Sequence, residues 1–180
     1  MSLSIILGPM FSGKSTELIR KIRLAKTINK KVLVIKPKID NRYDDNKVVS
    51  HSFESEICQT VDNLESLDSI IINYDLIVID EGQFFSDLKQ YVLKWLDIDN
   101  KDIIIGGLDG DFERKPIGQI LELIPYSDKC IKITSLCKMC NNGNEGIFTH
   151  RISKQLTNQI EIGGSETYMP LCRKHFLESN

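Results

Sequence analysis

The sequence contains no apolar run that approaches the roughly 18 residues needed for a membrane-spanning helix. Its first residues, Met-Ser-Leu-Ser-Ile-Ile-Leu, include neither a basic region nor a small-residue cleavage site, so we expect no export and a cytoplasmic location. Neither charge sign predominates, because 23 Lys and Arg residues stand against 25 Asp and Glu residues, for a net charge of −2. This balance gives no support to a broad electrostatic surface for nucleic acid or anionic membrane, and leaves room for a local basic site.

Internal repeats and low-complexity segments are also absent from the 180 residues, of which 41% are apolar and 27% are charged. This length and composition suit one globular domain with a small appendage. The five cysteines are an odd number, and in a chain without an export signal they favour metal ligands or reduced thiols over disulfides.

Short apolar runs alternate with segments of helical periodicity along most of the chain. The runs predict strands and the periodic segments predict helices. The expected strands cover residues 3–7, 32–35, 76–79 and 103–105, with a fifth near 131–134, and the expected helices cover 14–29 and 87–96. Residues 38–55 are polar, and we expect them to form an unusually long loop.

Because each predicted strand is apolar on both faces, we expect an α/β fold with a mostly parallel sheet flanked by helices. From Cys137 onward, glycine, asparagine and threonine replace the long apolar runs. The chain therefore divides into an α/β domain over residues 1–136 and a small β-rich unit over 137–180.

A phosphate-binding pattern, G-x-x-x-x-G-K-S, follows the first predicted strand and opens the first predicted helix. In this context backbone N–H groups and the helix N-terminus surround a phosphate, the lysine reaches the β- and γ-phosphates, and the serine can bind Mg²⁺. The alternative is a glycine-rich turn before an ordinary helix. The residues expected to hold the nucleotide are Gly8, Pro9, Met10, Phe11, Ser12, Gly13, Lys14 and Ser15. The core is thus predicted to be of the P-loop NTPase type.

A pair of carboxylates ends the predicted strand over residues 76–79. Ligands of open α/β sheets bind at the carboxyl ends of the strands, so Asp80 is placed to hold Mg²⁺ together with Ser15. Glu81 can take a proton from an attacking hydroxyl group. If that hydroxyl belongs to water, the protein is an ATPase; if it belongs to a substrate alcohol, the protein is a kinase, and the spacing does not choose between them.

Two short metal-binding patterns, C-x-x-C and C-x-x-H, frame the C-terminal unit, separated by 31 residues that must form a sizeable loop or hairpin. Four soft or borderline ligands suit tetrahedral Zn²⁺, and four protein ligands make the site closed and structural. A redox dithiol is the alternative for the cysteine pair. The expected zinc ligands are Cys137, Cys140, Cys172 and His175.

The remaining cysteines and histidines receive simpler interpretations. Cys58 and Cys130 are expected to be buried thiols, and His51 and His150 to be surface residues or local hydrogen-bonding partners. Residues 137–180 carry five Lys or Arg and four Asp or Glu, with no basic stripe interleaved with aromatic residues, so we expect no nucleic-acid binding.

Taken together, these motifs resemble the type II thymidine kinases, a family with a P-loop core and a zinc-bearing lasso domain. The similarity extends in family order over nearly the whole chain. It rests on GPMFSGKS at 8–15, KIDNRY at 38–43, DEGQFF at 80–85, LDGDFERKP at 108–116, both zinc patterns, and the Gly163-Gly164 pair ahead of Tyr168.

The resemblance implies an enzyme of nucleotide salvage for DNA synthesis, which transfers the γ-phosphate of ATP to the 5′-hydroxyl of thymidine, and of deoxyuridine. It implies that Glu81 is the general base, that Asp80, Gln83 and Ser15 organise Mg²⁺ and the reacting groups, and that Asp40 and Arg42 lie at the phosphate end. Residues 159–163 would form a lasso that closes over the base. The implied nucleoside-binding residues are Phe84, Leu108, Phe112, Gln159, Ile160, Glu161, Ile162, Gly163 and Tyr168.

The resemblance also implies a homotetramer inhibited by thymidine triphosphate. Two positions depart from the pattern: His175 stands where well-known animal members have cysteine, and Ile117 where many members have phenylalanine. The role of Arg114 stays open. The competing interpretations are a P-loop ATPase with a nucleic-acid-binding zinc module, and a catalytically silent nucleotide sensor.

Overall fold

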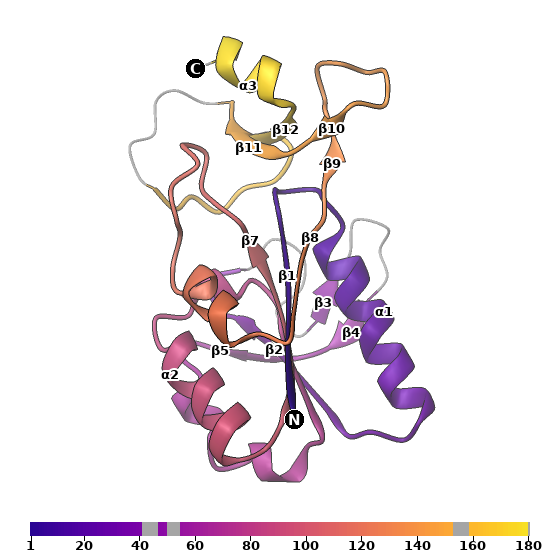
Figure 1. Ribbon diagram of the computed structural model, residues 1–180, viewed down its shortest axis with the longest axis vertical. Coiled ribbons are helices and arrows are strands. Elements are labelled where there is room, and N and C mark those ends of the chain that lie inside the picture. Colours follow the sequence, from indigo (N-terminus) through magenta and orange to yellow (C-terminus); the bar gives the residue numbers. More distant parts are fainter. Residues whose placement is uncertain (41–46, 50–54, 153–158, 180) are drawn as a thin grey trace.

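A six-stranded parallel sheet forms the centre of the computed structural model, which describes residues 1–40, 47–49, 55–152 and 159–179 (Figure 1). The strand order is β5-β2-β6-β7-β1-β8, and every described pairing within this sheet is parallel. The strands are β1 (Ser2–Gly8), β2 (Val32–Pro37), β5 (Gln59–Val61), β6 (Leu76–Ile79), β7 (Asp102–Leu108) and β8 (Lys129–Lys132). This confirms the predicted parallel α/β core.

The central strands are apolar because helices cover both faces of the sheet. All four residues of β6 are buried, and Ile35, Ile79 and Ile105 lie in register on three adjacent strands. Strands that are buried on both sides read as continuous apolar runs, as they do here. Since the strands are parallel, their carboxyl ends meet at one edge of the sheet, where the functional residues gather.

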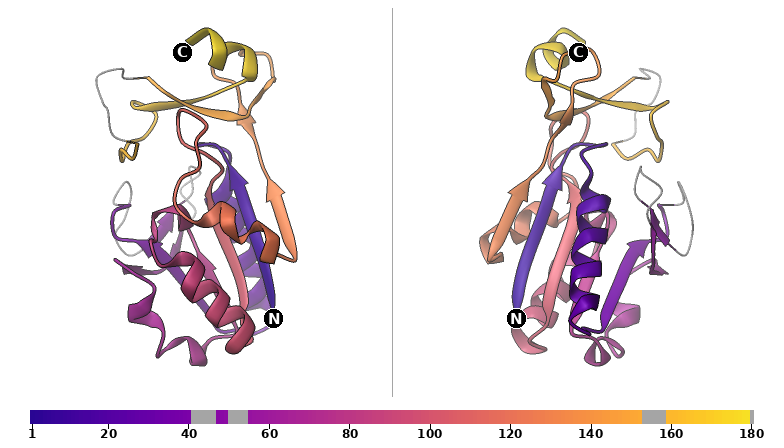
Figure 2. Two further views of the ribbon diagram at one scale, coloured as in Figure 1. Left: turned by 60° about the vertical axis from the view of Figure 1, so that its left-hand side comes forward. Right: turned by 90° about the vertical axis from the view of Figure 1, so that its right-hand side faces the viewer.

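One face of the sheet is covered by α1 (Lys14–Thr27), and the other by α2 (Leu88–Leu93) and the 3-10 helix η5 (Ile120–Tyr126), as Figure 2 shows. The helix expected over residues 87–96 extends from Leu88 to Ile98, where α2 passes into a π-helical turn, η4 (Lys94–Ile98), that buries Trp95. Three short 3-10 helices complete the connections: η1 (Glu65–Leu67), η2 (Ile71–Asn73) and η3 (Gly82–Phe84).

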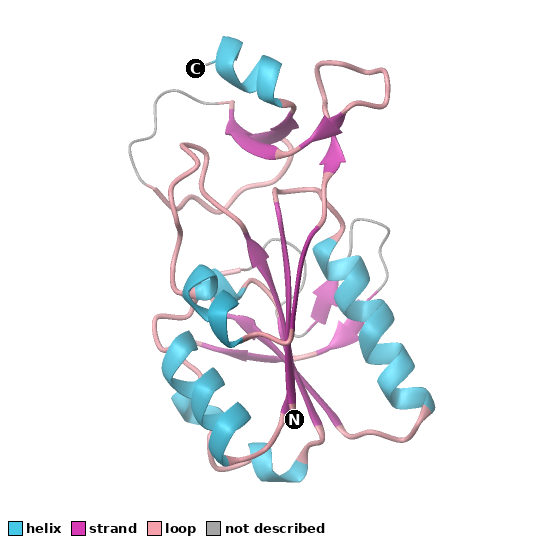
Figure 3. Ribbon diagram, in the orientation of Figure 1, coloured by secondary structure: helices cyan, strands magenta, loops and turns pink. Residues whose placement is uncertain are grey.

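The segment expected to be one long loop contains a small antiparallel hairpin, so this prediction was wrong in part. Strands β3 (Lys47–Val49) and β4 (Ser55–Ile57) pair with each other outside the main sheet (Figure 3). The physical reason is Val48, which is buried in the same apolar cluster as Leu18 and Ile22 of α1. One buried valine within a polar segment is a weak sequence signal for a strand.

A small C-terminal module lies beyond the carboxyl ends of the main sheet, at the top of Figure 1. Its described residues form two antiparallel pairs and one helix, namely β9 (Ser135–Leu136) with β10 (Glu145–Gly146), β11 (Phe148–Arg151) with β12 (Tyr168–Leu171), and α3 (Arg173–Ser179). Among the described residues, no helix is both long enough and apolar enough to cross a membrane.

Two predictions about single residues are corrected by this arrangement. Cys130 is exposed rather than buried, because β8 is an edge strand with most of its side chains toward solvent. His150 is buried, which excludes the surface position that was one of its two expected roles, and its ring packs edge-on against Phe176 at 6.2 Å between centroids. Cys58 is buried as expected, and His51 lies outside the described residues.

Candidate active site

The phosphate loop joins β1 to α1 and folds tightly on itself. Gly13 adopts a φ of 84° and Phe11 a φ of 64°, both in the left-handed region that produces the sharp turns of this loop. The Lys14 ammonium donates a hydrogen bond to the Pro9 carbonyl oxygen at 2.8 Å, as does the Ser12 hydroxyl. The buried lysine therefore points into the concave side of the loop, at the N-terminus of α1, where a phosphate binds most favourably.

Three buried carboxyl groups, those of Asp40, Asp80 and Glu81, cluster beside the phosphate loop. The Ser15 hydroxyl donates to Asp80 Oδ2 at 3.0 Å. Burial, and then the neighbouring charges of Glu81 and Asp40, raise the pKa of Asp80 to about 7, against the opposing effects of Ser15 and Lys14. A carboxylate and a hydroxyl oxygen at this distance, amid excess negative charge, form a donor set that fits Mg²⁺. Arg42 lies outside the described residues.

Glu81 is held in an uncommon backbone conformation with φ of 50°. Its backbone N–H donates to Asp80 Oδ1 at 3.0 Å, and its Oε2 accepts a hydrogen bond from Gln83 Nε2 at 2.7 Å. Gln83 Oε1 in turn accepts the Leu108 N–H of β7 at 3.1 Å. A Cβ on Gly107 would come within 2.4 Å of this amide oxygen, so the glycine makes room for the bridge from Glu81 to the sheet.

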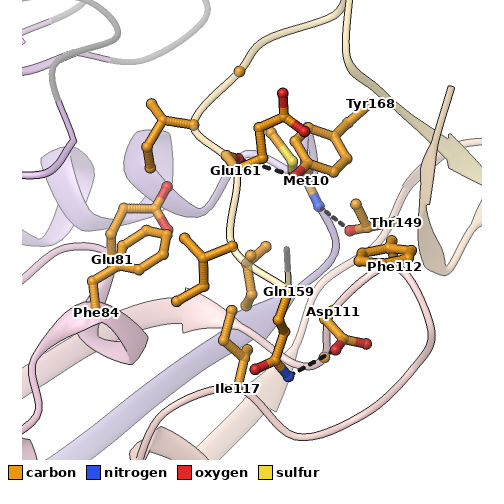
Figure 4. Close-up of a pocket in the computed structure, with 15 residues that line it drawn as sticks. Met10, Glu81, Phe84, Asp111, Phe112, Ile117, Thr149, Gln159, Glu161 and Tyr168 are labelled. Carbon is orange, nitrogen blue, oxygen red and sulfur yellow. Dashed lines mark hydrogen bonds between the residues drawn. The ribbon is translucent and has the colours of Figure 1, made fainter. Parts of the chain in front are cut away.

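A cavity opens next to Glu81, between the carboxyl edge of the sheet and the C-terminal module (Figure 4). It has apolar walls with a few polar groups, as small-molecule sites usually have. Its lining combines residues from five separate parts of the chain: Met10, Glu81, Phe84, Leu108, Gly110, Asp111, Phe112, Ile117, Thr149, Gln159, Ile160, Glu161, Ile162, Gly163 and Tyr168.

Hydrogen bonds fasten the segment over residues 159–163 across this cavity. The Gln159 side-chain amide donates to Asp111 Oδ2 at 2.8 Å and to the Pro116 carbonyl oxygen at 3.2 Å. The Tyr168 hydroxyl donates to the Glu161 carbonyl oxygen at 2.9 Å. The segment therefore closes one side of the cavity, with Glu81 and Phe84 on another side (Figure 4).

The side chains of Cys137, Cys140, Cys172 and His175 converge in the C-terminal module, with all four ligand atoms within 4.8 Å of one another. Cys140 Sγ and Cys172 Sγ lie 3.7 Å apart, and His175 Nδ1 lies 3.3–3.5 Å from the three sulfur atoms. Tetrahedral zinc with ordinary bond lengths gives ligand–ligand distances of about 3.8 Å for two sulfurs and about 3.6 Å for sulfur and nitrogen. The cluster can hold zinc with little rearrangement.

The thiols of this cluster differ in their electrostatics. A hydrogen bond from Asn144 acts to lower the pKa of Cys140, but burial and the neighbouring Cys137 and Cys172 thiols raise it above its usual value. Burial acts to raise the pKa of Cys137, but hydrogen bonds from backbone N–H groups, including those of Cys172 and Cys140, and from His175 outweigh it and lower that pKa to about 6. A thiol that ionises near neutral pH is prepared to bind a cation.

Comparison with known proteins decides the family. A family model described as thymidine kinase matches residues 1–176. The chain belongs to the thymidine kinase family. This membership supports a thymidine kinase activity that uses ATP.

Full-length relatives agree with the thymidine kinase assignment. A thymidine kinase of Oryza sativa subsp. japonica is 37% identical over 98% of this chain, which spans 66% of the rice protein's length. Thymidine kinase a of Arabidopsis thaliana is 38% identical, over 99% of this chain and 76% of the Arabidopsis protein's length. The thymidine kinase of Vaccinia virus (strain Western Reserve) is 39% identical over 98% of this chain and 97% of its own.

Within this thymidine kinase, all nine residues expected at the nucleoside line the cavity. The Gln83 side chain bridges Glu81 and β7, and its expected part in organising Mg²⁺ and the reacting groups stays a prediction. Asp111 and Thr149 were missed by sequence reasoning. Asp111 lies inside the quoted 108–116 block, which could have revealed it, whereas Thr149, which accepts the Met10 N–H at 3.0 Å, follows no recognisable motif.

Proposed function

We propose that this protein transfers the γ-phosphate of ATP, held at the phosphate loop, to the 5′-hydroxyl of thymidine bound in the cavity. The observation that carries this proposal is the position of Glu81. Its side chain lines the cavity, while its backbone adjoins Asp80, which is hydrogen-bonded to Ser15 of the phosphate loop. One carboxylate therefore stands where the acceptor hydroxyl and the phosphate donor must meet.

In this scheme each residue of the site has a distinct task. Glu81 accepts the proton of the 5′-hydroxyl as that oxygen attacks phosphorus, and the Gln83 amide holds the carboxylate in place. Lys14 exchanges its bond to the Pro9 carbonyl for the β- and γ-phosphates. Ser15 and Asp80 would hold Mg²⁺, which when bound neutralises charge on the migrating phosphoryl group.

The cavity supports a nucleoside as the acceptor. Phe84 and Phe112 supply aromatic walls for a flat base, and the backbone of residues 159–163 supplies N–H and C=O groups that can read its edge. Such backbone groups recognise the ring atoms that thymine and uracil share, so deoxyuridine is proposed as a second substrate. A segment closed over the cavity also excludes water from the transferred phosphate.

The decisive experiment measures ATP turnover by the purified protein with Mg²⁺ and one added acceptor: thymidine, deoxyuridine, deoxycytidine or single-stranded DNA. We expect phosphorylated product with thymidine and deoxyuridine, and loss of turnover in Glu81→Gln. ADP release driven by DNA, without a phosphorylated nucleoside, would favour the alternative of a P-loop ATPase with a nucleic-acid-binding zinc module. Nucleotide binding without any turnover would favour a silent sensor.

We further propose a homotetramer that thymidine triphosphate inhibits, as the family resemblance implies. Two exposed apolar side chains, Leu24 of α1 and Ile28 directly after it, supply surface suited to subunit contact. Light scattering coupled to size exclusion measures the assembly, and competition against thymidine and ATP shows which site the triphosphate occupies. A monomer that thymidine triphosphate leaves fully active contradicts both parts.

A further inference from the structure

Strand β11 connects the candidate zinc site with the phosphate loop and the cavity. Successive side chains of a strand point to opposite faces. Thr149 and Arg151 lie on the face toward the core, where Thr149 accepts a backbone N–H of the phosphate loop at 3.0 Å. Phe148 and His150 lie on the other face, with ring centroids 5.0 and 6.2 Å from that of Phe176, the neighbour of a zinc-ligand position.

Arg151 makes the densest set of contacts on the core-facing side. The residue is 5% exposed, and its guanidinium carbon lies 3.8 Å from the centroid of the Phe112 ring and 5.6 Å from that of Tyr168. One terminal nitrogen donates to the Tyr168 hydroxyl at 3.1 Å and to the Gln159 carbonyl oxygen at 3.2 Å. A single side chain thus joins two walls of the cavity and the segment that closes it, without itself lining the cavity.

Arg114 makes a matching contact from the α/β core to the C-terminal module. It belongs to the same loop as Phe112, and its guanidinium carbon lies 5.0 Å from the centroid of Phe176 and 5.5 Å from that of Phe148. Its backbone has a φ of 66°, inside a turn in which buried Asp111 accepts two backbone N–H groups. The loop that carries Phe112 and Arg114, hereafter the core loop, therefore contacts the C-terminal module through Arg114. The module in turn contacts the core loop through Arg151.

We propose that Arg151 and Arg114 are positioning residues, which through these reciprocal arginine–aromatic contacts make the C-terminal module set the geometry of the thymidine cavity. This proposal rests on the proposed binding of thymidine between Phe112 and Tyr168. It also gives Arg114, whose role the motifs leave open, a defined function. Because Phe176 follows His175 directly, the same contacts couple the metal cluster to the nucleoside site.

Arg151 combines a contact on the Phe112 ring with hydrogen bonds to Tyr168 and Gln159, and this combination requires arginine. A planar guanidinium can stack on an aromatic face while its edge donates hydrogen bonds, whereas a lysine ammonium is a compact charge that cannot do both. Arg151→Lys preserves the charge and removes the plane. We expect it to raise the KM for thymidine about tenfold, with the KM for ATP and the bound zinc unchanged. Arg114→Lys should raise the KM for thymidine in the same direction.

Arg114→Lys provides the sharper test, because this residue is exposed and its replacement leaves the core intact. The matched control is Arg173→Lys. Arg173 is also exposed, and its guanidinium carbon also lies 5.0 Å from the Phe148 centroid, but both Arg173 and Phe148 belong to the C-terminal module. It should leave the KM for thymidine unchanged. The double variant Arg114→Lys/Arg151→Lys should be less than additive, since both contacts hold the same loop.

Unchanged KM for thymidine in both folded single variants would overturn the proposal. An equal rise in the KM values for thymidine and ATP would overturn it as well, because that pattern indicates general loss of structure. Phe112→Leu separates this outcome from failure of the proposed function. If Phe112→Leu weakens thymidine binding and the arginine variants do not, only the positioning role fails; if Phe112→Leu has no effect either, thymidine does not bind in this cavity.

Discussion

Replacing Asp80 with asparagine is expected to stabilise the ligand-free protein while abolishing its kinase activity. The Asp80 carboxyl group is buried at the end of β6, and burial together with the charges of Glu81 and Asp40 raises its pKa to about 7. Asparagine preserves the hydrogen bonds, since its Oδ1 can accept the Glu81 N–H and its amide can donate to the Ser15 hydroxyl. The substitution therefore removes a costly charge and leaves the shape of the site in place.

The size and sign of the change in the free energy of unfolding follow from the proton affinity of Asp80 in the folded and unfolded states. Each tenfold change in proton affinity is worth about 1.4 kcal/mol, so raising a pKa from 3.8 to about 7 corresponds to roughly 4 kcal/mol. The folded state binds this proton more tightly than the unfolded state. Ionisation of Asp80 thus lowers the free energy of unfolding progressively between about pH 4 and pH 7, and by a constant amount above that range. Since neighbouring groups relax, we expect Asp80→Asn to raise the free energy of unfolding by about 2–4 kcal/mol at pH 8, which corresponds to about 5–10 °C in Tm.

Thermal unfolding of the wild type and of Asp80→Asn between pH 5 and pH 8, without nucleotide or Mg²⁺, measures this effect. The difference in Tm should grow with pH and become constant above about pH 7. The control is Asp62→Asn, which removes an equal charge from a side chain that is 74% exposed. Parallel Tm profiles for the wild type and Asp80→Asn would refute the reasoning, because they would mean that Asp80 ionises equally easily in both states.

Three further perturbations test other parts of the structure. Gln83→Met releases Glu81 and should lower kcat by about 10²-fold with little change in the KM for ATP; an unchanged kcat contradicts the positioning role of the amide. Gly118→Ala should lower the free energy of unfolding by more than about 3 kcal/mol, because φ is 58° and the new Cβ would lie 2.0 Å from the Gln83 carbonyl oxygen. Gly143→Ala, with φ of 89° but open space around it, should cost only about 1 kcal/mol, and equal losses in urea unfolding would argue against the steric explanation. His175→Ala should release zinc and lower Tm, whereas His175→Cys should retain the metal, as inductively coupled plasma analysis can establish.

Local patterns in the sequence were sufficient for the parts of the fold that rest on local physics. The apolar runs of β1, β2, β6 and β7 predict buried parallel strands because each is covered on both faces. The phosphate loop and the two metal-binding patterns are equally local, since their residues are neighbours in sequence. Family membership followed from the order of these blocks and is shown by the comparisons.

Features that depend on distant pairing were not predictable in this way. The edge strand β5 has no long apolar run, and Cys130 becomes exposed only because β8 ends the sheet. The contact of Thr149 with the phosphate loop spans 139 residues, and the stacking of Arg151 on Phe112 requires the module to dock first. Such contacts depend on tertiary arrangement, for which a single sequence offers no periodic signal.

The position of β1 within the sheet also determines when the protein can become functional during its synthesis. This strand is synthesised well before its neighbours, which are β7, through pairs such as Ser2 with Asp102, and β8, through pairs such as Ser4 with Lys129. Its apolar side chains stay exposed until β7 and β8 have been translated. Pairing segments so far apart in sequence slows folding and leaves the nascent chain prone to aggregation. The phosphate loop follows β1 directly, so it is translated long before the strands that hold β1 in the sheet, and it can acquire its structure only after they are made.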